Sequence, residues 1–343
     1  MKKIILSTFA FFFTTTIAFS QLNNSWIDYS KTYYKFPLAK DTLCRINQPV
    51  LVAAGLGAVP AENFQLWRNG KQVRIYTSLA TGVLGASDYI EFWGEMNDGK
   101  PDNNLYRNPA SQLSEKFSLE TDTVIYFLTV NTNSASNLRY IQNSNIIVGN
   151  TLPASPYFMR KIEQYYRNII NKGYAAVIGE YVFSSSYDIG EGWSSVGVGP
   201  GSPLSKDFTG LNRYAAGPPN SVIFTVGASG YSLNARDLVC RFYNTPVLQT
   251  PMPFFEYVKD TVRNLPLSLL LNPTNLPVSV GTTSSNPNES MVVSNFSVTY
   301  PATFNFNNEK NFYFELEPSA TGNYLKIANF NYNGQQPILY DYS

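Results

Sequence analysis

The sequence contains no histidine and only two cysteines, and these two shortages limit the chemistry open to it. Without histidine the chain has neither a Ser-His-Asp triad nor a Cys-His dyad, because both use an imidazole as general base. Zinc sites built on histidine are excluded as well, and two thiolates cannot make an all-cysteine zinc site. Acid–base catalysis by this chain would therefore fall to carboxylates, lysine or tyrosine.

Charge is also scarce. Charged residues make up 14% of the chain, against a usual quarter or so, and the formal net charge is +1. No cluster of lysine or arginine stands out after the N-terminus, so the electrostatic footprint of nucleic-acid binding is missing. Hydrophobic residues supply 44% of the chain and aromatic residues 15%, which is ample for large cores. A length of 343 residues predicts two or three domains.

Long apolar runs are confined to the first twenty residues. There, Lys2 and Lys3 precede an apolar run and the small-x-small sequence Ala18-Phe19-Ser20, which is the pattern of a Sec signal peptide. We expect Gln21 to begin the mature chain, and the protein to be exported to the periplasm, the outer-membrane surface or the extracellular space. No transmembrane helix is expected in the mature chain. In an oxidising compartment Cys44 and Cys240 either pair or remain separate buried thiols, and the sequence leaves both open.

The strand and turn patterns predict a mostly β protein: two β-sandwich-like domains, the second a candidate jelly roll, joined by one α-helix and a Gly-rich link. Asn69-Gly70 predicts a hairpin with a type I′ turn. Apolar residues at helical spacing over 157–171, followed by Gly173, predict the helix. Strands are expected at 64–68, 72–76, 89–93, a central buried one at 123–130, and then at 222–226, 238–242, 291–300 and 312–316.

The expected division follows from these elements. It gives a signal peptide over 1–20, an N-terminal β domain over 21–152, the helix and Gly-rich link over 153–210, and a C-terminal β-sandwich over 211–343. A further strand starting at 337 suggests that the chain stops before a catalytic domain, although a terminal strand that completes a sheet would look the same.

The stretch 86-ASDYIEFWGEMNDGKPDNN-104 is the richest in carboxylates. Glu91 alternates with Ile90 and Phe92 and is expected to face solvent. Asn97-Asp98-Gly99 is a strong turn signal. Asp98 and Asp102 are candidate calcium ligands, because calcium accepts carboxylates and carbonyls flexibly, although the spacing does not match an EF-hand loop. A solvated turn without metal is the alternative.

A second acidic group, 187-YDIGEGW-193, places Asp188 and Glu191 around Gly190. A glycosidase would need two such carboxylates across a sugar-sized cleft, and a loop fixed by a buried Trp193 is the simpler interpretation. The tryptophans at 26, 67, 93 and 193 would suit either a carbohydrate platform or a core.

Four stretches, in this order, resemble the N-terminal, pre-catalytic region of gingipain-like cysteine peptidases, with most similarity to the PorU-like sortase (signal peptidase) of the type IX secretion system. They are Ser87–Glu95 with Asn97-Asp98-Gly99, then 123–129, then Tyr187–Trp193, and last 292–301 followed by 337–341. The family-motif residues, expected to be structural, are Asp88, Tyr89, Glu91, Trp93, Gly94, Gly99, Gly190, Glu191, Gly192 and Trp193. Ser87 stands where the family usually has glycine, and Ala-Val-Ile replaces aromatics near 177, so a non-sortase member of the family fits too.

The resemblance implies a function for the chain. In that family a His-Cys dyad in a later α/β domain carries out catalysis, and no residue here corresponds to it. We therefore expect this chain not to be an enzyme, to need no cofactor, and to belong to a parent cysteine endopeptidase. Its expected role is to brace or orient its own peptidase domain, or to dock secretion substrates or outer-membrane secretion proteins. The alternatives are a stand-alone carbohydrate-binding module or an adhesin-type surface protein, and, less favoured, a carboxylate glycosidase.

Overall fold

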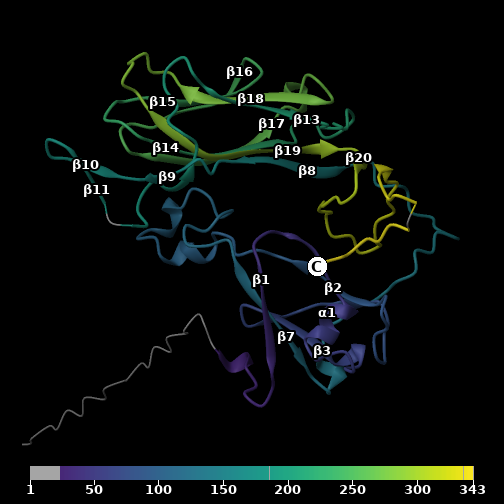
Figure 1. The fold of residues 1–343 in the computed structure, drawn as a ribbon. Helices are drawn as coiled ribbons and strands as arrows, with labels where there is room; N and C mark the ends of the chain where they lie inside the picture. The colour runs from purple at the N-terminus through teal and green to yellow at the C-terminus, as the bar shows by residue number, and fades with distance from the viewer. Residues whose placement is uncertain (1–23, 185, 335, 343) are drawn as a thin grey trace, which may run out of the picture. The chain divides into compact units, whose positions relative to one another are not determined.

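The computed structural model describes residues 24–184, 186–334 and 336–342, and the expected signal peptide lies outside them. The chain forms two compact units (Figure 1). Unit 1 comprises the described residues up to Asn97 together with Asp122–Ser144, and unit 2 comprises Asp98–Thr121 and the chain from Asn145 onward. The chain therefore leaves unit 1 at Asn97, contributes 24 residues to unit 2, and returns. This excursion was not expected from the sequence, which predicted one continuous N-terminal domain.

Unit 1 is a small sandwich of two antiparallel sheets. One sheet has the order β1-β7-β3-β4 and the other the order β2-β6-β5. Their facing side chains form one core that includes Phe64, Ile90, Phe92 and Tyr126, all fully buried. The elements are η1 Asn24–Trp26, β1 Tyr33–Leu38, β2 Thr42–Asn47, α1 Gln48–Ala53, η2 Ala61–Asn63, β3 Phe64–Arg68, β4 Lys71–Val73, β5 Tyr76–Thr77, β6 Tyr89–Gly94, β7 Val124–Val130 and η5 Ser134–Ser136.

Two predictions for unit 1 are confirmed. β3 and β4 pair across Asn69 and Gly70, which have φ of +47° and +74°, the two positive values that a type I′ turn requires. β7 pairs with β1 on one side and β3 on the other, so the apolar run at 123–130 is the central strand of its sheet.

Unit 2 is built on two four-stranded antiparallel sheets, β13-β18-β15-β16 and β17-β14-β19-β8. Taken in chain order, the eight strands pair first with last, second with seventh, third with sixth and fourth with fifth. Such nested pairing is one long double strand rolled into two sheets, which is a jelly roll. The strands are β8 Phe158–Tyr165, β13 Leu204–Thr209, β14 Val222–Gly230, β15 Asp237–Phe242, β16 Thr245–Pro251, β17 Tyr257–Leu265, β18 Asn275–Thr282 and β19 Met291–Ala302.

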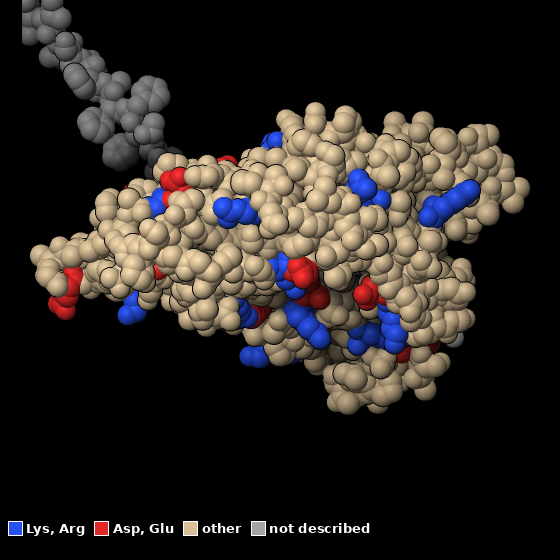
Figure 2. Space-filling view, turned by 90° about the horizontal axis from the view of Figure 1, so that it is seen from above, with Lys and Arg blue, Asp and Glu red and all other residues tan. Residues whose placement is uncertain are grey.

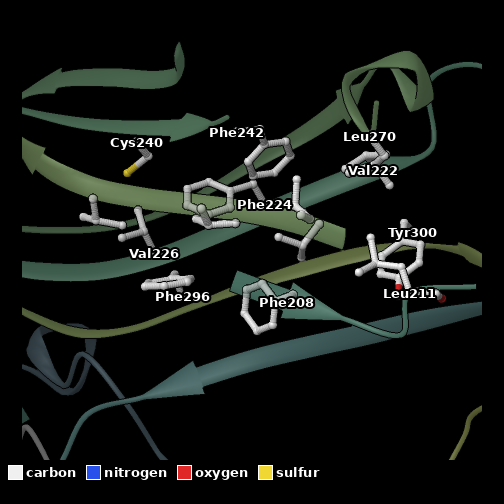
Figure 3. Packing of buried hydrophobic residues seen from close by; sticks show 14 of the residues in the cluster. Phe208, Leu211, Val222, Phe224, Val226, Cys240, Phe242, Leu270, Phe296 and Tyr300 are labelled. Carbon is white, nitrogen blue, oxygen red and sulfur yellow. Dashed lines mark hydrogen bonds between the residues drawn. The ribbon is translucent and has the colours of Figure 1, made fainter. Parts of the chain in front are cut away.

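The core of unit 2 lies between these two sheets (Figure 3). Phe224 of β14 meets Phe242 of β15 edge to face, with ring centroids 5.5 Å apart. Phe208 of β13 meets Phe296 of β19 in the same way at 6.0 Å. Burial of each such side chain contributes about 1.5–3 kcal/mol, so this core supplies the main driving force for unit 2.

The predicted connecting helix over 157–171 is wrong, because this segment forms edge strand β8 beside β19. Phe158, Ile162 and Tyr166 pack on the core. Residues four apart lie on the same face of an α-helix, and they also lie on the same face of a strand, where side chains alternate every two residues. Their spacing of four therefore fits both structures. The exposed face decides between them. Lys161 and Glu163 form an ion pair, and residues two apart share a face only in a strand.

The rest of the predicted link is also folded. After β8 the chain forms a long hairpin, the arm, in which β9 Ile169–Lys172 pairs with β12 Glu191–Ser194. At its tip β10 Ala175–Val177 pairs with β11 Tyr181–Phe183. The labels β10 and β11 lie at the end of this projection in Figure 1. The loop between β12 and β13 keeps the irregular, Gly-rich character that was expected.

The segment after β19 closes one end of the sandwich. Phe306 stacks on Phe312 with ring centroids 4.0 Å apart, and Phe314 packs on both Phe304 and Phe306. The strand predicted at 312–316 is wrong, since these residues make no ladder, although Phe312, Phe314 and Leu316 pack against the core. The strand predicted from 337 is absent from the described residues there. The remaining elements are η3 Pro101–Asn104, η4 Pro109–Ser111, η6 Leu267–Leu269, β20 Asn305–Glu309 and β21 Ala328–Phe330.

The surface follows the composition. Figure 2 shows a face on which charged side chains are few and sit singly or in small groups of mixed sign. Among the described residues no helix has the length and apolar character needed to cross a membrane. Both cysteines are free thiols, Cys44 half-buried and Cys240 fully buried.

Candidate functional site

The carboxylate-rich stretch 86–104 is divided between the two units. Asp88, Glu91 and Glu95 belong to unit 1, whereas Asp98 and Asp102 belong to unit 2. Each unit therefore has its own acidic element, and each is described by itself.

In unit 1 the prediction that Glu91 faces solvent is wrong, because only 2% of this residue is exposed. The strand alternation was right, since Glu91 lies on the face opposite Ile90 and Phe92. However, Arg45 stands directly across on β2, and its Nε and Nη2 donate to one carboxylate oxygen of Glu91 at 2.9 and 2.6 Å. The same guanidinium lies 3.7 Å from the centre of the Tyr89 ring. Cross-strand neighbours thus enclose the carboxylate.

The other motif residues of unit 1 also contact their own unit. The Asp88 carboxylate accepts from the Ser78 hydroxyl and from the Gly85 amide, both at 2.8 Å, and so closes the loop before β6. Gly94 has no room for a side chain, because a Cβ there would overlap Leu38 and come 2.8 Å from the Cys44 sulfur. These contacts fit the expected structural role.

In unit 2 the segment 98–121 is fastened to the jelly roll. The Asn295 side-chain amide donates to the Leu113 carbonyl at 3.1 Å, and the Lys259 ammonium donates to the Gln112 carbonyl at 2.9 Å. Within the segment, Asp102 is 4% exposed, and its two oxygens accept from the Ser118 hydroxyl at 3.0 Å and the Leu119 amide at 2.7 Å. Asp102 therefore holds the two ends of the segment together.

The calcium candidates are already occupied by protein donors. Asp98 accepts from the Lys100 amide at 3.1 Å and pairs with the Lys100 ammonium at 2.9 Å. Nowhere in the described parts of the chain do three or more Cys, Asp or Glu gather as a metal site would require. Calcium at Asp98 and Asp102 stays a prediction, and binding there would have to displace these donors.

The 187-YDIGEGW-193 element lies at the base of the arm and contacts segment 98–121. The Trp193 indole donates to the Ser118 carbonyl at 3.0 Å, and the Tyr106 hydroxyl donates to the Glu191 carbonyl at 2.9 Å. Gly190 has a φ of +72°, and a Cβ there would overlap the Ser229 hydroxyl of β14. Glycine is needed at this position for both reasons.

These contacts surround a cavity of about 10 Å³, counted as space open to the centre of a water molecule. That volume suits about one water, so a sugar ring does not fit. In unit 2 it brings together sequence-predicted residues from distant stretches, Asp102 with Glu191, Gly192 and Trp193. We call these residues and Tyr106 the brace. The full lining is Asp102, Tyr106, Gln112, Leu113, Ser114, Phe117, Leu119, Tyr166, Glu191, Gly192, Trp193 and Ser294.

Burial dominates the electrostatics of the brace. It raises the pKa of the Tyr106 hydroxyl, and the charges of Glu191 and Asp102 act in the same direction. Burial also raises the pKa of the Glu191 carboxyl, against the hydrogen bonds from the Asp188 and Tyr187 amides. The Asp188 pKa is lowered instead, first by the hydrogen bond from the Ser184 hydroxyl, and further by the Ile189 amide and by Arg107, 3.5 Å away.

Asp188 and Glu191 do not face each other across a cleft. The Glu191 carboxylate accepts from the Asp188 amide at 3.1 Å, and the Asp188 carboxylate accepts from the Ile189 amide at 2.7 Å. Both acids thus hold the turn in which they lie, which is not the arrangement a glycosidase uses.

The tryptophans do not form a flat row either. In unit 1 Trp26 contacts Trp67 at 5.4 Å with the rings inclined by 33°, and it also packs on Phe127 at 50°. In unit 2 the Arg167 guanidinium lies 4.7 Å from the Trp193 ring.

Sequence reasoning missed several residues that complete these sites. Tyr106 and Ser118 belong to no motif, and only the fold brings them to Glu191 and Trp193. Arg236 and Glu289, an ion pair with both side chains fully buried, tie together three loops at one end of the jelly roll. A single arginine and a single glutamate 53 residues apart give no signal in the sequence.

The sequence matches no protein-family model and no curated protein. Among solved structures, a dimeric latent PorU from Porphyromonas gingivalis is 10% identical, with a TM-score of 0.47 over 80% of this chain and 24% of that chain. This chain thus spans about a quarter of that protein. The CBM36-1 domain of a multidomain xylanase from the hindgut metagenome of Trinervitermes trinervoides is 11% identical, with a TM-score of 0.25 over 40% of this chain and 96% of that chain. A carbohydrate-binding module CBM36 in complex with calcium and xylotriose is 14% identical, with a TM-score of 0.24 over 40% of this chain and 98% of that chain. Likeness at this level assigns no function to any residue of this chain.

Proposed function

We propose that this chain is a non-catalytic region of an exported gingipain-like cysteine peptidase, of the kind that precedes the peptidase domain in PorU-like sortases. Its role is to brace or orient that domain, or to dock secretion substrates or outer-membrane secretion proteins. The proposal begins with the order of the four family-like stretches along the sequence. It gains support from what the acidic residues of those stretches do.

The observation that carries the proposal is that the motif carboxylates bind groups of their own unit. Asp88 binds Ser78 and the Gly85 amide, Glu91 binds Arg45, and Glu191 binds the Asp188 amide. A carboxylate already bound by donors of its own unit is poorly placed to accept a proton from a substrate. The same contacts hold loop segments rigidly, which suits a scaffold.

The state of the two thiols agrees with a non-catalytic role. Burial raises the pKa of the Cys44 thiol and, more strongly, that of Cys240. A cysteine nucleophile needs a lowered pKa and access to solvent, because the thiolate is the reactive form. Both cysteines therefore suit a packing role.

Export follows from the expected signal peptide over 1–20. We propose the periplasm, the outer-membrane surface or the extracellular space as the location, and no cofactor, with calcium at Asp98 and Asp102 the one candidate. The sparse charge and exposed aromatic content suit a protein that works among other surface proteins rather than with nucleic acid.

The test is to purify the mature chain from Gln21 and titrate it with a gingipain-like peptidase domain from the same organism, by calorimetry and by a peptide-hydrolysis assay. We expect no hydrolysis by the chain alone, binding of the peptidase domain, and a change in that domain's activity. Trp193→Phe loosens the brace by removing the indole donor and is expected to weaken the effect, whereas Leu271→Ala, at an exposed site, is the matched control.

Two outcomes would overturn the proposal. Hydrolysis of peptides by the purified chain itself would make it an enzyme. Binding to an oligosaccharide on a glycan array, with no affinity for the peptidase domain, would favour the carbohydrate-binding alternative.

A further inference from the structure

A groove of about 320 Å³, counted as space open to the centre of a water molecule, lies at one end of the jelly roll. Three loops meet there: 231–236 between β14 and β15, 252–256 between β16 and β17, and 283–290 between β18 and β19. The groove shares no residue with the brace or with the two acidic stretches. Its volume is at the lower limit of ordinary ligand sites, so it accommodates a long side chain or a small molecule.

The loops around the groove are held by one buried arginine. The Arg236 guanidinium donates to the Met252 carbonyl at 2.8 Å and to the Phe254 carbonyl at 2.7 Å. It also donates to the Ser232 carbonyl at 3.0 Å and forms the buried ion pair with Glu289. Each of the three loops is therefore fixed to this side chain. The walls of the groove are set before a ligand arrives, which lowers the cost of binding.

The polar part of the lining consists of one carboxylate and two hydroxyls. Asp237, half-buried at the start of β15, accepts from the Gln249 side-chain amide with Oδ2 at 2.9 Å. No described residue donates to its Oδ1 or forms an ion pair with it. Thr283 and Ser284 supply the hydroxyls. Ser284 Oγ accepts from the Asn286 amide at 3.2 Å and keeps a second lone pair. The groove therefore holds a negative charge that the described protein leaves unbalanced.

The rest of the groove is apolar and continues into an exposed aromatic ring. Pro251 and Pro253 line it, and Phe254, the next residue, is 51% exposed. The φ of Phe254 is +55°, a left-handed conformation that is unfavourable for so bulky a side chain. Phe255 beside it is buried against the arm, where it meets Tyr181 edge to face at 5.4 Å. The fold thus keeps the Phe254 ring in solvent on a strained backbone, and such strain is typical of ligand sites.

The charges around the groove favour a basic partner. Glu256, in the same loop as Phe254, and Glu180, at the tip of the arm, are exposed and make no ion pair with described residues. Lys172 is the only basic residue of the arm, and its ammonium lies 5.1 Å from the centre of the Phe183 ring. The accessible charge at this end of unit 2 is therefore mainly negative.

From these groups we infer that the groove binds a lysine side chain carried by an extended peptide segment. An ammonium has three donors, and the lining offers one carboxylate and two hydroxyls as acceptors. The flat fork of an arginine prefers both oxygens of a carboxylate, and Gln249 already occupies one oxygen of Asp237. The aliphatic stem of the lysine packs along the two prolines, and an apolar neighbour in the peptide contacts Phe254.

Other ligands fit this lining less well. A neutral sugar would leave the Asp237 charge unpaired, and a lipid surface would move that charge away from water without a partner. The lysine ligand answers the charge, the hydroxyls and the apolar walls together. The contact is small, below the roughly 1,200 Å² of stable complexes, so binding should be weak.

The test is fluorescence anisotropy of a labelled peptide, acetyl-Gly-Phe-Lys-Phe-Gly-amide, titrated with the mature chain from about 5 μM to about 1 mM. We expect a dissociation constant of about 50–500 μM. Matched peptides with norleucine or Nε-acetyllysine in place of lysine keep the stem but lose the charge. They should bind at least about tenfold more weakly.

Substitutions in the chain separate the charge from the apolar contact. Asp237→Asn keeps an acceptor for Gln249, and it should weaken the lysine peptide at least about tenfold while leaving the norleucine peptide unchanged. Asp207→Asn, at an exposed aspartate of β13 outside the groove, is the matched control and should bind as wild type. Phe254→Ala should weaken both peptides alike, by about threefold.

Several results would overturn the inference. They are equal binding of the lysine and norleucine peptides, unchanged affinity in Asp237→Asn, or no binding at about 1 mM. Sedimentation with neutral phosphatidylcholine vesicles that is lost in Phe254→Ala but kept in Asp237→Asn would show a lipid contact instead. None of these experiments contains a peptidase domain, so a negative result would count against the groove and not against the bracing role.

Discussion

The two units bury the carboxylates of the two acidic stretches by different means. In unit 1, Glu91 is neutralised by an arginine from the neighbouring strand, whose side chain stays 49% exposed. In unit 2, Asp102 is satisfied by neutral donors, a serine hydroxyl and a backbone amide, and Glu191 by backbone amides. On a sheet face, a buried carboxylate can pair with a long cationic side chain from the neighbouring strand. In a folded-back loop, the donors within reach are mainly backbone amides of the loop itself. The ion pair should respond to salt, and the neutral hydrogen bonds should respond to geometry alone.

The largest expected effect on stability comes from the motif glycines, and it should be larger for the glycine of unit 2 than for that of unit 1. Gly190→Ala in unit 2 forces a side chain into a positive φ and against Ser229, and we expect a loss of about 2–4 kcal/mol in the free energy of unfolding. Gly179→Ala, also at positive φ but with open space around it, should lose only about 1 kcal/mol. Equal losses, measured by urea unfolding, would show that Gly190 has no packing role.

Gly94→Ala in unit 1 sharpens this contrast. Gly94 has an ordinary φ, and its Cβ would press on the Leu38 side chain and the Cys44 sulfur, which can shift. We expect about 1–3 kcal/mol, less than for Gly190. Urea unfolding of both variants should give this order, and the reverse order would contradict the assigned roles.

Arg45→Met should cost about 1–3 kcal/mol, because it removes charged hydrogen bonds to a buried carboxylate while keeping the side-chain stem. Since Arg45 is half-exposed, the loss should shrink when thermal unfolding is repeated at about 1 M salt, where charges are screened within about 3 Å. Ser118→Ala in unit 2 removes a neutral donor and serves as the matched control. If the stability loss of Ser118→Ala changes with salt, or that of Arg45→Met does not, the two units do not bury their carboxylates by the different means described here.

Two acids of unit 2 should titrate in opposite senses. The Glu191 pKa is raised by burial, so its contribution to stability is present below its unfolded value, near 4.5, and is lost as pH rises through the higher folded pKa. The Asp188 pKa is lowered, chiefly by Ser184, so its contribution is present above 3.8 and is lost as pH falls through the lower folded pKa. Relative to wild type, Glu191→Gln should gain stability as pH rises above about 4.5, and Asp188→Asn should recover stability as pH falls below about 3.8. Urea titrations in which the stability of both variants relative to wild type changes with pH in the same direction would contradict the environments described for Glu191 and Asp188.

The smallest expected effect concerns calcium. Because Lys100, Ser118 and the Leu119 amide occupy Asp98 and Asp102, we expect about 5 mM calcium to shift the melting temperature by less than about 1 °C. A larger rise that Asp102→Asn abolishes would show that calcium displaces these donors.

Much of the architecture could be predicted because it follows local rules. The Asn69-Gly70 hairpin, the central strand at 123–130 and the mostly β sandwich class came from turn chemistry and from two-residue alternation. The helix at 157–171 failed because a four-residue spacing satisfies both periods, so only the exposed Lys161–Glu163 pair distinguishes them. The run at 312–316 alternates correctly but has no neighbouring strand to bond.

The candidate site could be predicted only in part. The sequence singled out Asp102 as a calcium candidate and Glu191 and Trp193 as family-motif residues, but it did not indicate that the three meet. Their meeting depends on segment 98–121 leaving unit 1 for unit 2, and no local signal marks that excursion. Glu91 shows the same limit, because strand alternation gives the face of a side chain but not what covers it.

The most direct test of the central claim, that the buried acids of the two acidic stretches brace the fold rather than act on a substrate, is the free energy of unfolding of Asp102→Ala by urea titration. The account predicts a loss of about 2–3 kcal/mol, because the Ser118 hydroxyl and the Leu119 amide lose their buried acceptor. Acids held for catalysis or binding are commonly neutral or stabilising when removed. An Asp102→Ala variant as stable as wild type, or more stable, would contradict the account and would indicate a functional role for this carboxylate.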